Sequence, residues 1–550
     1  MAYLKNDLAS DIAERLRDAE ARADECWRAL ELRYYPSNLA TWAVLSGGIK
    51  IVEREQAARG SNTPHFGAML SNLSRLLAIA AKWVMCHGQP AADLDSRWTG
   101  ELSTFVDQTL SLAKAYSCFE VCFQGFHKGR YAADVSSPSL IRFSVPGSAR
   151  DRQVSAYQKG LRPSDGRFAT QRAAQRPQTP RVVDAFDRAL RASRPIGSLR
   201  FAYADPWDLW RELVPEYSGR VMALARRADT LSLGDYTLAE FNAFYVALIV
   251  ICAAHDHLCF RWAQAQGVYP LESAVMVRTV PEWTEVLSTL SGVTPEKCRA
   301  MIGDLTFSIK LSVDLHVYPF IPLGDANKTL ALAPPFPLHS RHDENILRAC
   351  SQRRPHVYDV TSREKESEML AAVRTVSGRY RADGSVHLPN PVPDIDLLAV
   401  DESSSTLVIA ELKWIRKTVR PAEILDRDAD VLKGIGQLDT IRAYLQAHPD
   451  YLLVRGLVQR PVTEYRNVHY LLVARDHWRW VEPHNDVAVV EFEPFARALG
   501  RSANLREAIG ELLTYDWLPV EGRDFRIQYD KATANSVTIE SPVFYSAAPP

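Results

Sequence analysis

The chain has 550 residues, of which 47% are apolar and 24% charged, which predicts a soluble protein with a substantial core and two to four folding units. Its 65 basic and 66 acidic residues give a net charge of -1, which excludes a general polycation, so any nucleic-acid contact has to come from a local patch. The N-terminal segment is charged and lacks the apolar run of a secretory signal. The longest apolar stretch, residues 244–254, is shorter than the ~20 residues of a membrane span and predicts a buried helix. We therefore expect a cytoplasmic protein without membrane contact.

Most of the first three hundred residues have apolar side chains at helical spacing. This pattern predicts a helical domain over residues 1–135 and a helical region over residues 201–340 that ends in short strands. Residues 306–324 alternate apolar and polar side chains like a strand, and residues 328–335 predict a second short strand. No motif in this part indicates a function.

Residues 136–200 interrupt the helical pattern. The segment is rich in Pro, Gly and Ser, and residues 141–194 contain twelve Arg or Lys against four Asp. It is predicted to be a basic linker or an extended excursion from the fold. Two interpretations stay open: the basic side chains track phosphates and release counterions, or the segment is a solvated loop.

Residues 341–550 alternate helical and strand patterns, which is typical of an α/β domain. Within them, residues 390–414 (NPVPDIDLLAVDESSSTLVIAELKW) predict a β-hairpin, because two apolar runs flank a polar turn. Since side chains alternate faces along a strand, Glu411 and Lys413 share one face, and Asp394 and Asp396 point the same way as each other.

Acidic and basic side chains therefore emerge together at the end of an apolar hairpin. A carboxylate beside a buried sheet loses hydration and needs compensation. Two converging carboxylates repel each other unless a divalent cation lies between them. A lysine on the same face can orient the attacking water and offset charge on a reacting phosphate. This combination suits phosphodiester hydrolysis.

Pro393-Asp394-Ile395-Asp396 followed by Glu411-Leu412-Lys413, fifteen residues after Asp396, resembles the PD-(D/E)XK, or restriction-endonuclease-like, nuclease superfamily. The resemblance covers residues 345–500 and implies an α/β domain with a central mixed sheet. It also implies that Asp396 and Glu411 bind Mg²⁺ (or Mn²⁺) with help from the Leu412 carbonyl, and that Lys413 is catalytic. Asp394 follows Pro393 directly and stays an alternative as the motif aspartate and metal ligand.

The same resemblance places further residues on the helices that flank the hairpin. An acid is implied on the preceding helix, where Glu366 lies in line with the apolar stripe, whereas Glu368 falls about 200° away and faces solvent. On the following helix Gln437 fits the position of an active-site glutamine, although the QxxxY signature of the exonuclease branch is absent because residue 441 is Ile. Basic residues near the site that could hold nucleic acid are Lys433, Arg416 and Lys417.

The sequence offers no further metal-ligand cluster or nucleotide-binding motif that would indicate a function. The eight cysteines lack paired metal-ligand spacing, and Cys118 and Cys122 have apolar neighbours, so we expect packed or reduced thiols. His255 and His257 lie about 200° apart on a helix and cannot share a metal. GxGxxG, GxxxxGK[ST] and GxSxG are absent, which leaves ATP-driven translocation and α/β-hydrolase chemistry without support.

The sequence thus predicts a Mg²⁺-dependent nuclease, with DNA favoured over RNA as its substrate. The alternative is a non-catalytic module that binds nucleic acid or protein on a degenerate nuclease fold. The helical region would regulate the site, position the substrate, bind a regulatory partner or form a homo-oligomer. By architecture alone, such a fusion suits bacterial defence against foreign DNA.

Overall fold

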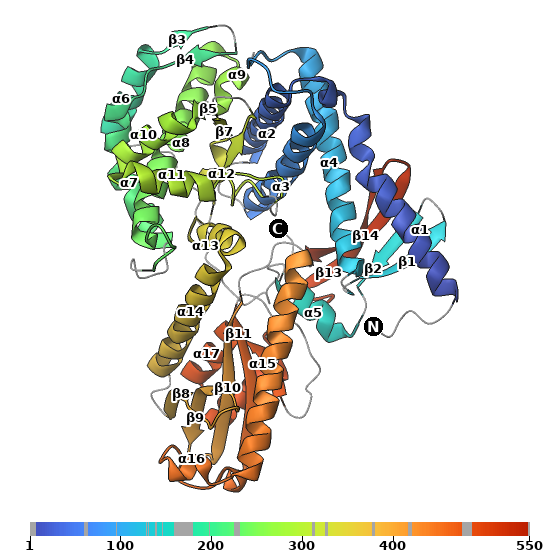
Figure 1. The fold of residues 1–550 in the computed structure, drawn as a ribbon, viewed down its shortest axis with the longest axis vertical. Helices are drawn as coiled ribbons and strands as arrows, with labels where there is room; N and C mark the ends of the chain where they lie inside the picture. The colour runs from blue at the N-terminus through green and yellow to red at the C-terminus, as the bar shows by residue number, and fades with distance from the viewer. Residues whose placement is uncertain are drawn as a thin grey trace.

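The computed structural model describes residues 7–59, 64–94, 96–127, 129, 131–137, 140–145, 147–158, 180–196, 199–224, 231–310, 314–324, 328–340, 342–376, 380–415, 421–475 and 487–547. These residues form two bodies, each with its own hydrophobic core. Figure 1 shows a larger, mainly helical body and a smaller body built around a sheet, with α14 leading from one to the other.

The larger body contains most of the N-terminal helices. They are α1 (Asp7–Asp24), η1 (Cys26–Ala29), η2 (Glu31–Tyr34), α2 (Ser37–Arg59), α3 (Pro64–His87), α4 (Gly100–His127), α6 (Pro180–Arg191), α7 (Trp207–Leu224), α8 (Leu238–Gln266), α9 (Leu271–Ala274), α10 (Val280–Ser291), α11 (Pro295–Asp304), α12 (Pro335–Leu338) and α13 (His342–Arg353). This helical N-terminal region is as the sequence predicted. This body also contains a two-stranded sheet of β3 (Arg194–Pro195) and β4 (Phe201–Ala202) and a three-stranded sheet of β5 (Met276–Thr279), β7 (Thr329–Leu332) and β6 (Phe320–Pro322).

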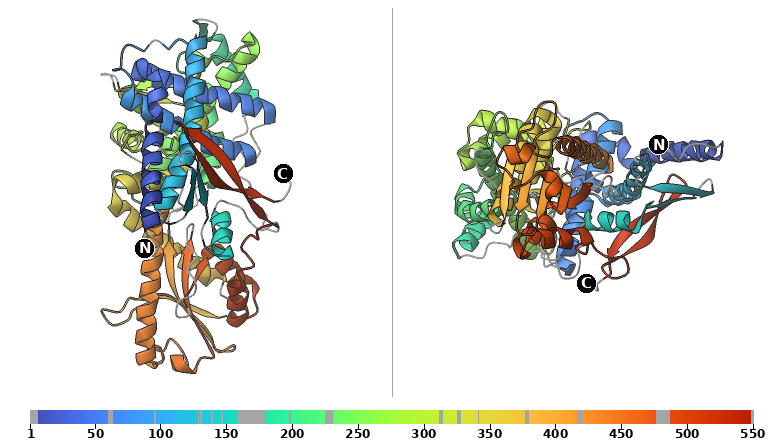
Figure 2. Two further views of the ribbon diagram at one scale, coloured as in Figure 1. Left: turned by 90° about the vertical axis from the view of Figure 1, so that its right-hand side faces the viewer. Right: turned by 90° about the horizontal axis from the view of Figure 1, so that it is seen from below.

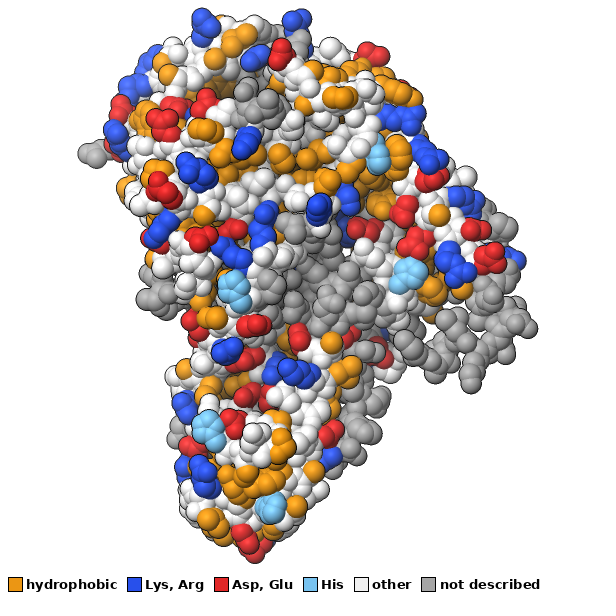
Figure 3. Space-filling model, in the orientation of Figure 1, with side chains coloured by type: hydrophobic (Ala, Val, Ile, Leu, Met, Phe, Trp, Pro, Cys, Tyr) orange, Lys and Arg blue, Asp and Glu red, His pale blue; other side chains and the backbone are white. Residues whose placement is uncertain are grey.

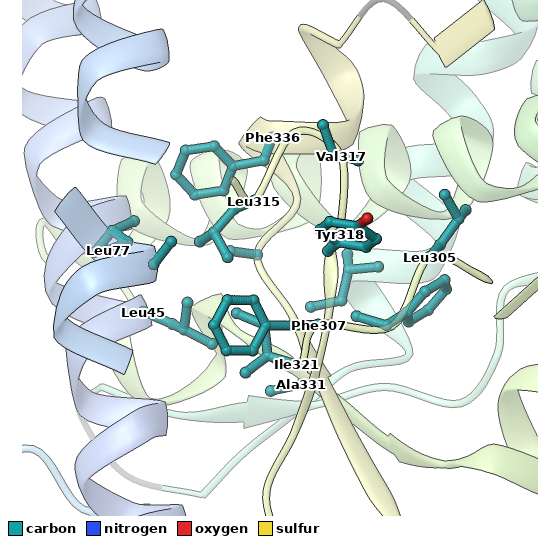
Figure 4. Close-up of a cluster of buried hydrophobic side chains, with 14 of the residues drawn as sticks. Leu45, Leu77, Leu305, Phe307, Leu315, Val317, Tyr318, Ile321, Ala331 and Phe336 are labelled. Carbon is teal, nitrogen blue, oxygen red and sulfur yellow. The ribbon is translucent and has the colours of Figure 1, made fainter. Parts of the chain in front are cut away.

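The core of this body is formed by side chains from distant segments, part of which Figure 4 shows. Leu45 of α2 and Leu77 of α3 meet Leu315, Ile321 and neighbouring aromatic residues there. Helix α8 is long and apolar enough to cross a membrane by length and composition, but 78% of its most apolar window is buried inside the protein. It is therefore the central core helix, as predicted for residues 244–254.

The strand expected over residues 306–324 is mostly wrong. Only Phe320–Pro322 pairs as a strand, β6, while the described residues before it form turns and loops. Their apolar side chains, such as Phe307 and Leu315, are still buried. The alternation of apolar and polar side chains therefore reflects burial in an irregular segment and not a strand. The second strand, expected over residues 328–335, forms as β7.

The smaller body contains a five-stranded mixed sheet of order β12-β11-β10-β9-β8. Its strands are β8 (Arg381–Val386), β9 (Ile395–Asp401), β10 (Thr406–Trp414), β11 (Asn467–Arg475) and β12 (Val487–Glu491). Its helices are α14 (Pro355–Val376), α15 (Pro421–Ala447), α16 (Tyr451–Val454), η3 (Val462–Glu464), α17 (Phe492–Arg501) and α18 (Leu505–Thr514). Strands β8, β9 and β10 are antiparallel neighbours, whereas β10, β11 and β12 run parallel. The predicted hairpin is therefore β9 and β10.

Helices cover both faces of this sheet. A side chain on Gly384 of β8 would meet Leu370 of α14, while one on Gly434 of α15 would meet Leu472 of β11. Leu472 pairs with Glu411, so α15 covers the face that carries Glu411, and α14 covers the opposite face together with α17. The parallel strands β10, β11 and β12 are apolar along their length because both of their faces are buried.

The segment over residues 136–200, predicted as a linker or an excursion, contains ordered elements that pack in both bodies. Strands β1 (Ala132–Ser137) and β2 (Leu140–Ser144) join a sheet of the larger body, and α6 packs there against α7 and α8. Helix α5 (Ala149–Gln158) crosses to the smaller body, where Val154 and Tyr157 belong to its core. Residues 159–179, which hold five of the basic side chains, lie outside the described residues.

The predicted domain of residues 341–550 also needs correction at both ends. Helix α13 packs in the core of the larger body, so the boundary falls near residue 355. Strands β13 (Phe525–Ala534) and β14 (Val537–Ser546) return to the larger body, in a sheet of order β1-β2-β14-β13. Ile539 of β14 is fully buried there and pairs in parallel with Ile141 of β2.

Candidate active site

Asp396 and Glu411 lie on the neighbouring strands β9 and β10, one residue beyond the last pair of the ladder between them. The register that pairs Leu397 with Ala410 places Asp396 opposite Glu411, so both side chains project from the same face of the sheet. The ladder between β9 and β10 ends at Leu397 and Ala410. Beyond it, the Leu412 amide donates to Asp396 Oδ2 at 3.0 Å, which fixes the carboxylate beside Glu411.

Glu411 is a buried carboxylate with an incomplete set of partners. Its side chain is only 2% exposed, and Lys413 Nζ lies 2.6 Å from its Oε1 atom. Its Oε2 atom is buried and receives no hydrogen bond from the part of the chain that the structure describes. An anionic oxygen in this position is costly, so it calls for a cation or a proton.

The pKa values of the two carboxyls record this cost. Burial raises the pKa of Glu411 to about 7, and the charge of Asp396 acts in the same direction against the attraction of Lys413. Burial likewise raises the pKa of Asp396, although the Leu412 amide and Lys413 oppose it. Burial alone would lower the pKa of Lys413, but the charge of Glu411 outweighs it and the net shift is upward. Lysine 413 is therefore cationic at neutral pH.

Glu366 reaches the same site from the other face of the sheet. It lies on α14, with Met369 and Val373 buried on the same side of the helix and Glu368 exposed, as the helical spacing predicted. Its Oε1 atom accepts hydrogen bonds from the Trp414 amide and the Ser362 hydroxyl, both at 3.2 Å. Burial raises the pKa of Glu366, while the charge of Lys413 lowers it, which shows that the two groups share one electrostatic environment.

Helix α15 closes the site on the Glu411 face. A Cβ atom on Gly434 would lie 2.6 Å from Leu472 Cδ1 and 3.6 Å from Glu411 Cγ, so the helix backbone lies directly over the Glu411 side chain. Gln437 follows one turn later on this helix, and its Oε1 atom is buried and accepts no hydrogen bond from the described residues. The sequence reasoning identified Gln437 but not Gly434, whose only signal was a glycine inside a helical pattern.

Of the remaining predicted residues, Asp394 is engaged away from the Asp396–Glu411 pair. Asp394 accepts hydrogen bonds from the Leu388 amide at 3.1 Å and lies 2.7 Å from His387 Nδ1, so both carboxylate oxygens are used at the start of β9. This geometry favours Asp396 over Asp394 as the motif aspartate. Lys433 is exposed on α15. Arg416 and Lys417 lie outside the described residues.

No protein-family model, curated protein or solved structure matches this chain.

The donor set of the site fits a hard divalent cation. Asp396 and Glu411 present carboxylate oxygens, and the Glu411 Oε2 atom, which has no donor within the described part of the chain, is an available ligand. No three His, Cys, Asp or Glu side chains converge as a ready-made metal cage within the described ranges. Two carboxylates are nonetheless enough for Mg²⁺, which retains several water molecules and is commonly held by one or two carboxylates plus substrate phosphate.

The described surface agrees with a site of local rather than global charge. In the view of Figure 3, acidic and basic side chains are interspersed over both bodies, without a single-sign field on the described part of that face. Long-range attraction of a polyanion is therefore weak on this face. Binding of nucleic acid would depend on the site itself and its immediate surroundings.

Proposed function

We propose that the protein is a divalent-metal-dependent nuclease of the restriction-endonuclease-like kind, with its active site formed by Asp396, Glu411 and Lys413. One observation carries the proposal. A buried carboxylate, Glu411, whose Oε2 atom has no hydrogen-bond donor among the described residues, stands opposite a second carboxylate and 2.6 Å from a lysine. A purely structural salt bridge would need one acid for one lysine, whereas this site has three acids around Lys413.

Asp396 and Glu411 would hold Mg²⁺ or Mn²⁺, which supplies Lewis acidity and an activated water when bound. Lys413, as a cation, offers N–H donors to the scissile phosphate and offsets the charge that develops on it. Glu366 holds the Trp414 amide and keeps the end of β10 in place. Gln437 presents an acceptor from α15 that can orient a water molecule. Mixed-sheet topology, with a helix on each side of the hairpin, supports the same family.

The direct test measures cleavage of supercoiled plasmid, linear duplex DNA, single-stranded DNA and RNA with Mg²⁺ or Mn²⁺. We expect the wild type to cleave DNA in preference to RNA. Glu411→Gln and Lys413→Met should each reduce the rate by at least about 100-fold, because they remove groups that act on the reacting phosphate or its metal.

Glu364→Gln is the matched control for this test. Glu364 is an exposed acid on the same α14 helix as Glu366, so its neutralisation should leave the rate unchanged. Equal rates in the wild type, Glu411→Gln and Lys413→Met would refute the proposal. Binding of nucleic acid without cleavage under either metal would instead identify a non-catalytic module on the same fold.

A further inference from the structure

Helices α13 and α14 meet at a bend that contains a single residue, Arg354. Helix α13 ends at Arg353 and α14 begins at Pro355. Proline has no amide hydrogen, and its ring clashes with the carbonyl four residues earlier, so a straight helix cannot continue through it. The Arg354 amide still donates to the Cys350 carbonyl at 2.6 Å. The bend therefore lies directly at the Arg354–Pro355 junction.

The Arg354 side chain anchors this bend to the larger body. Its Nη2 atom pairs with Asp304 Oδ2, at the end of α11, and lies 3.3 Å from Cys350 Sγ. Its Nη1 atom lies 3.3 Å from Asp235 Oδ2. The Tyr236 hydroxyl donates to the same Asp304 oxygen at 2.6 Å. The Arg354 side chain is 20% exposed, and its guanidinium contacts three segments of the larger body at once.

The same helix contacts the candidate active site further along. Val357, in its first turn, packs in the core of the larger body, whereas Met369 packs in the core of the smaller one. Between them, Ser362 and Glu366 hold the end of β10 through the Trp414 backbone. Twelve residues of helix separate Arg354 from Glu366, which corresponds to roughly 18 Å. Figure 1 shows α14 leaving α13 and running down beside the sheet.

We propose that Arg354 is a positioning residue for the active site, through which the larger body sets the placement of Glu366. The catalytic part of this inference rests on the proposed function. A helix transmits a displacement along its length because its hydrogen bonds make it stiff. Arg354 directly precedes the first residue of α14, so its anchor fixes where this helix begins. Release of the Arg354 anchor would let the start of α14 move relative to β10. The Glu366–Trp414 hydrogen bond is then the first contact with the site to weaken.

The first experiment reads this contact without using activity. Hydrogen exchange of the peptide that contains Trp414 is followed by mass spectrometry in Arg354→Met, Asp304→Asn and the wild type. The Trp414 amide is expected to exchange roughly ten times faster in both variants, because its acceptor has shifted. Arg363→Met is the matched control, since Arg363 is exposed on the same helix, and it should leave exchange unchanged. Unchanged Trp414 exchange in folded variants would overturn the inference.

Arg354→Lys is a milder second variant that keeps the test available if Arg354→Met does not fold. Lysine keeps the charge but cannot bind Asp304 and Asp235 with the two arms of a guanidinium. It should show the same direction of effect as Arg354→Met with a smaller amplitude. If neither Arg354→Lys nor Asp304→Asn changes the exchange rate of the Trp414 amide, Arg354 does not anchor the helix.

A double-mutant cycle links the anchor to catalysis. Arg354→Met should raise the Mg²⁺ concentration for half-maximal cleavage by roughly tenfold in the wild-type background. In the Glu366→Gln background the same change should have less than about a twofold effect, although residues this far apart normally act independently. Independent effects in an enzyme that cleaves would refute the inference alone. Absence of cleavage by the wild type would refute the proposed function, and hydrogen exchange would still decide the inference.

Discussion

The Asp396 carboxylate accepts the Leu412 amide at 3.0 Å, where the ladder between β9 and β10 has ended. The amide is thereby satisfied by a side chain in place of a neighbouring strand. Because Asp396 makes this bond, it is held opposite Glu411, where burial raises its pKa against the opposing effect of Lys413. The fold thus brings two desolvated carboxylates together in the metal-free protein, at a cost in stability that a bound cation would offset.

Neutralising Asp396 should therefore stabilise the metal-free protein. The pKa of Asp396 is raised in the folded state, so its charged form is less favourable there than in the unfolded chain at neutral pH and above. Asp396→Asn keeps an acceptor for the Leu412 amide and removes the charge. We expect a higher Tm than the wild type at pH 8 in EDTA, measured by calorimetry, and loss of cleavage. A lower Tm would show that the carboxylate is stabilising.

Metal binding should depend on pH through Glu411. Its folded pKa of about 7 lies above its ordinary value near 4.5, so metal-free stability falls as pH rises through this window. Mg²⁺ binds the deprotonated carboxylate and releases a proton, so the increase in Tm caused by Mg²⁺ should be small at pH 5.5 and grow up to about pH 8. Thermal scans with and without EDTA across this range test it. An increase in Tm independent of pH would exclude Glu411 as the ligand.

Two glycines of α15 provide a matched pair of substitutions. Gly434→Ala would place a methyl group 2.6 Å from Leu472 Cδ1 and against Glu411, whereas Gly436 has open space around it. Gly436→Ala should stabilise the helix by about 0.5–1 kcal/mol. Gly434→Ala should be less stable than Gly436→Ala by roughly 1–3 kcal/mol because of overpacking, and should weaken cleavage. Urea unfolding and cleavage rates measure both; equal stabilities would mean that α15 does not press on the site.

Asp401 should account for part of the acid sensitivity of the smaller body. Burial would raise its pKa, but hydrogen bonds from Ser403, Ser404 and the Leu505 amide outweigh burial and lower the pKa to about 2. Its stabilising contribution is thus full above about pH 4 and is lost as pH falls towards 2. Asp401→Asn should cost roughly 2 kcal/mol at pH 7. The difference from the wild type should disappear near pH 2, as urea unfolding at both pH values would show.

The local part of the site was predictable from the sequence. Alternation along residues 395–401 and 406–414 fixes the shared face of Asp396 and Glu411, and helical spacing selects Glu366 over Glu368. These are properties of one or two neighbouring elements. Spacing along one helix does not by itself decide which apolar side chain is buried: Leu432 of α15 is 51% exposed, whereas Ile435, Leu438 and Ile441 are buried.

The contacts between segments that lie far apart in the sequence were not predictable. A basic, Pro- and Gly-rich segment gives no sign that Val154 and Tyr157 will pack in a core whose other members begin at Met369. Strand β8 contains Asp383 and Gly384 and lacks the apolar alternation that identifies a strand. Its extended conformation is stabilised by backbone pairing with β9 and not by its own sequence pattern. The expectation that Asp394 could be a ligand depended on the position of His387 and Leu388, which only the folded chain reveals.

The pairing of β14 with β2 has a consequence for the order of folding. Thr538 lies opposite Leu140, so the larger body is completed by a strand that the ribosome makes after the whole five-stranded sheet. Contacts of such long sequence separation form slowly, and the surface that awaits the late strand stays open to water until then. The sheet that carries Asp396 and Glu411 can therefore assemble during synthesis before its larger neighbour is closed. A nascent chain would reach the finished arrangement of α14 only once both steps are complete.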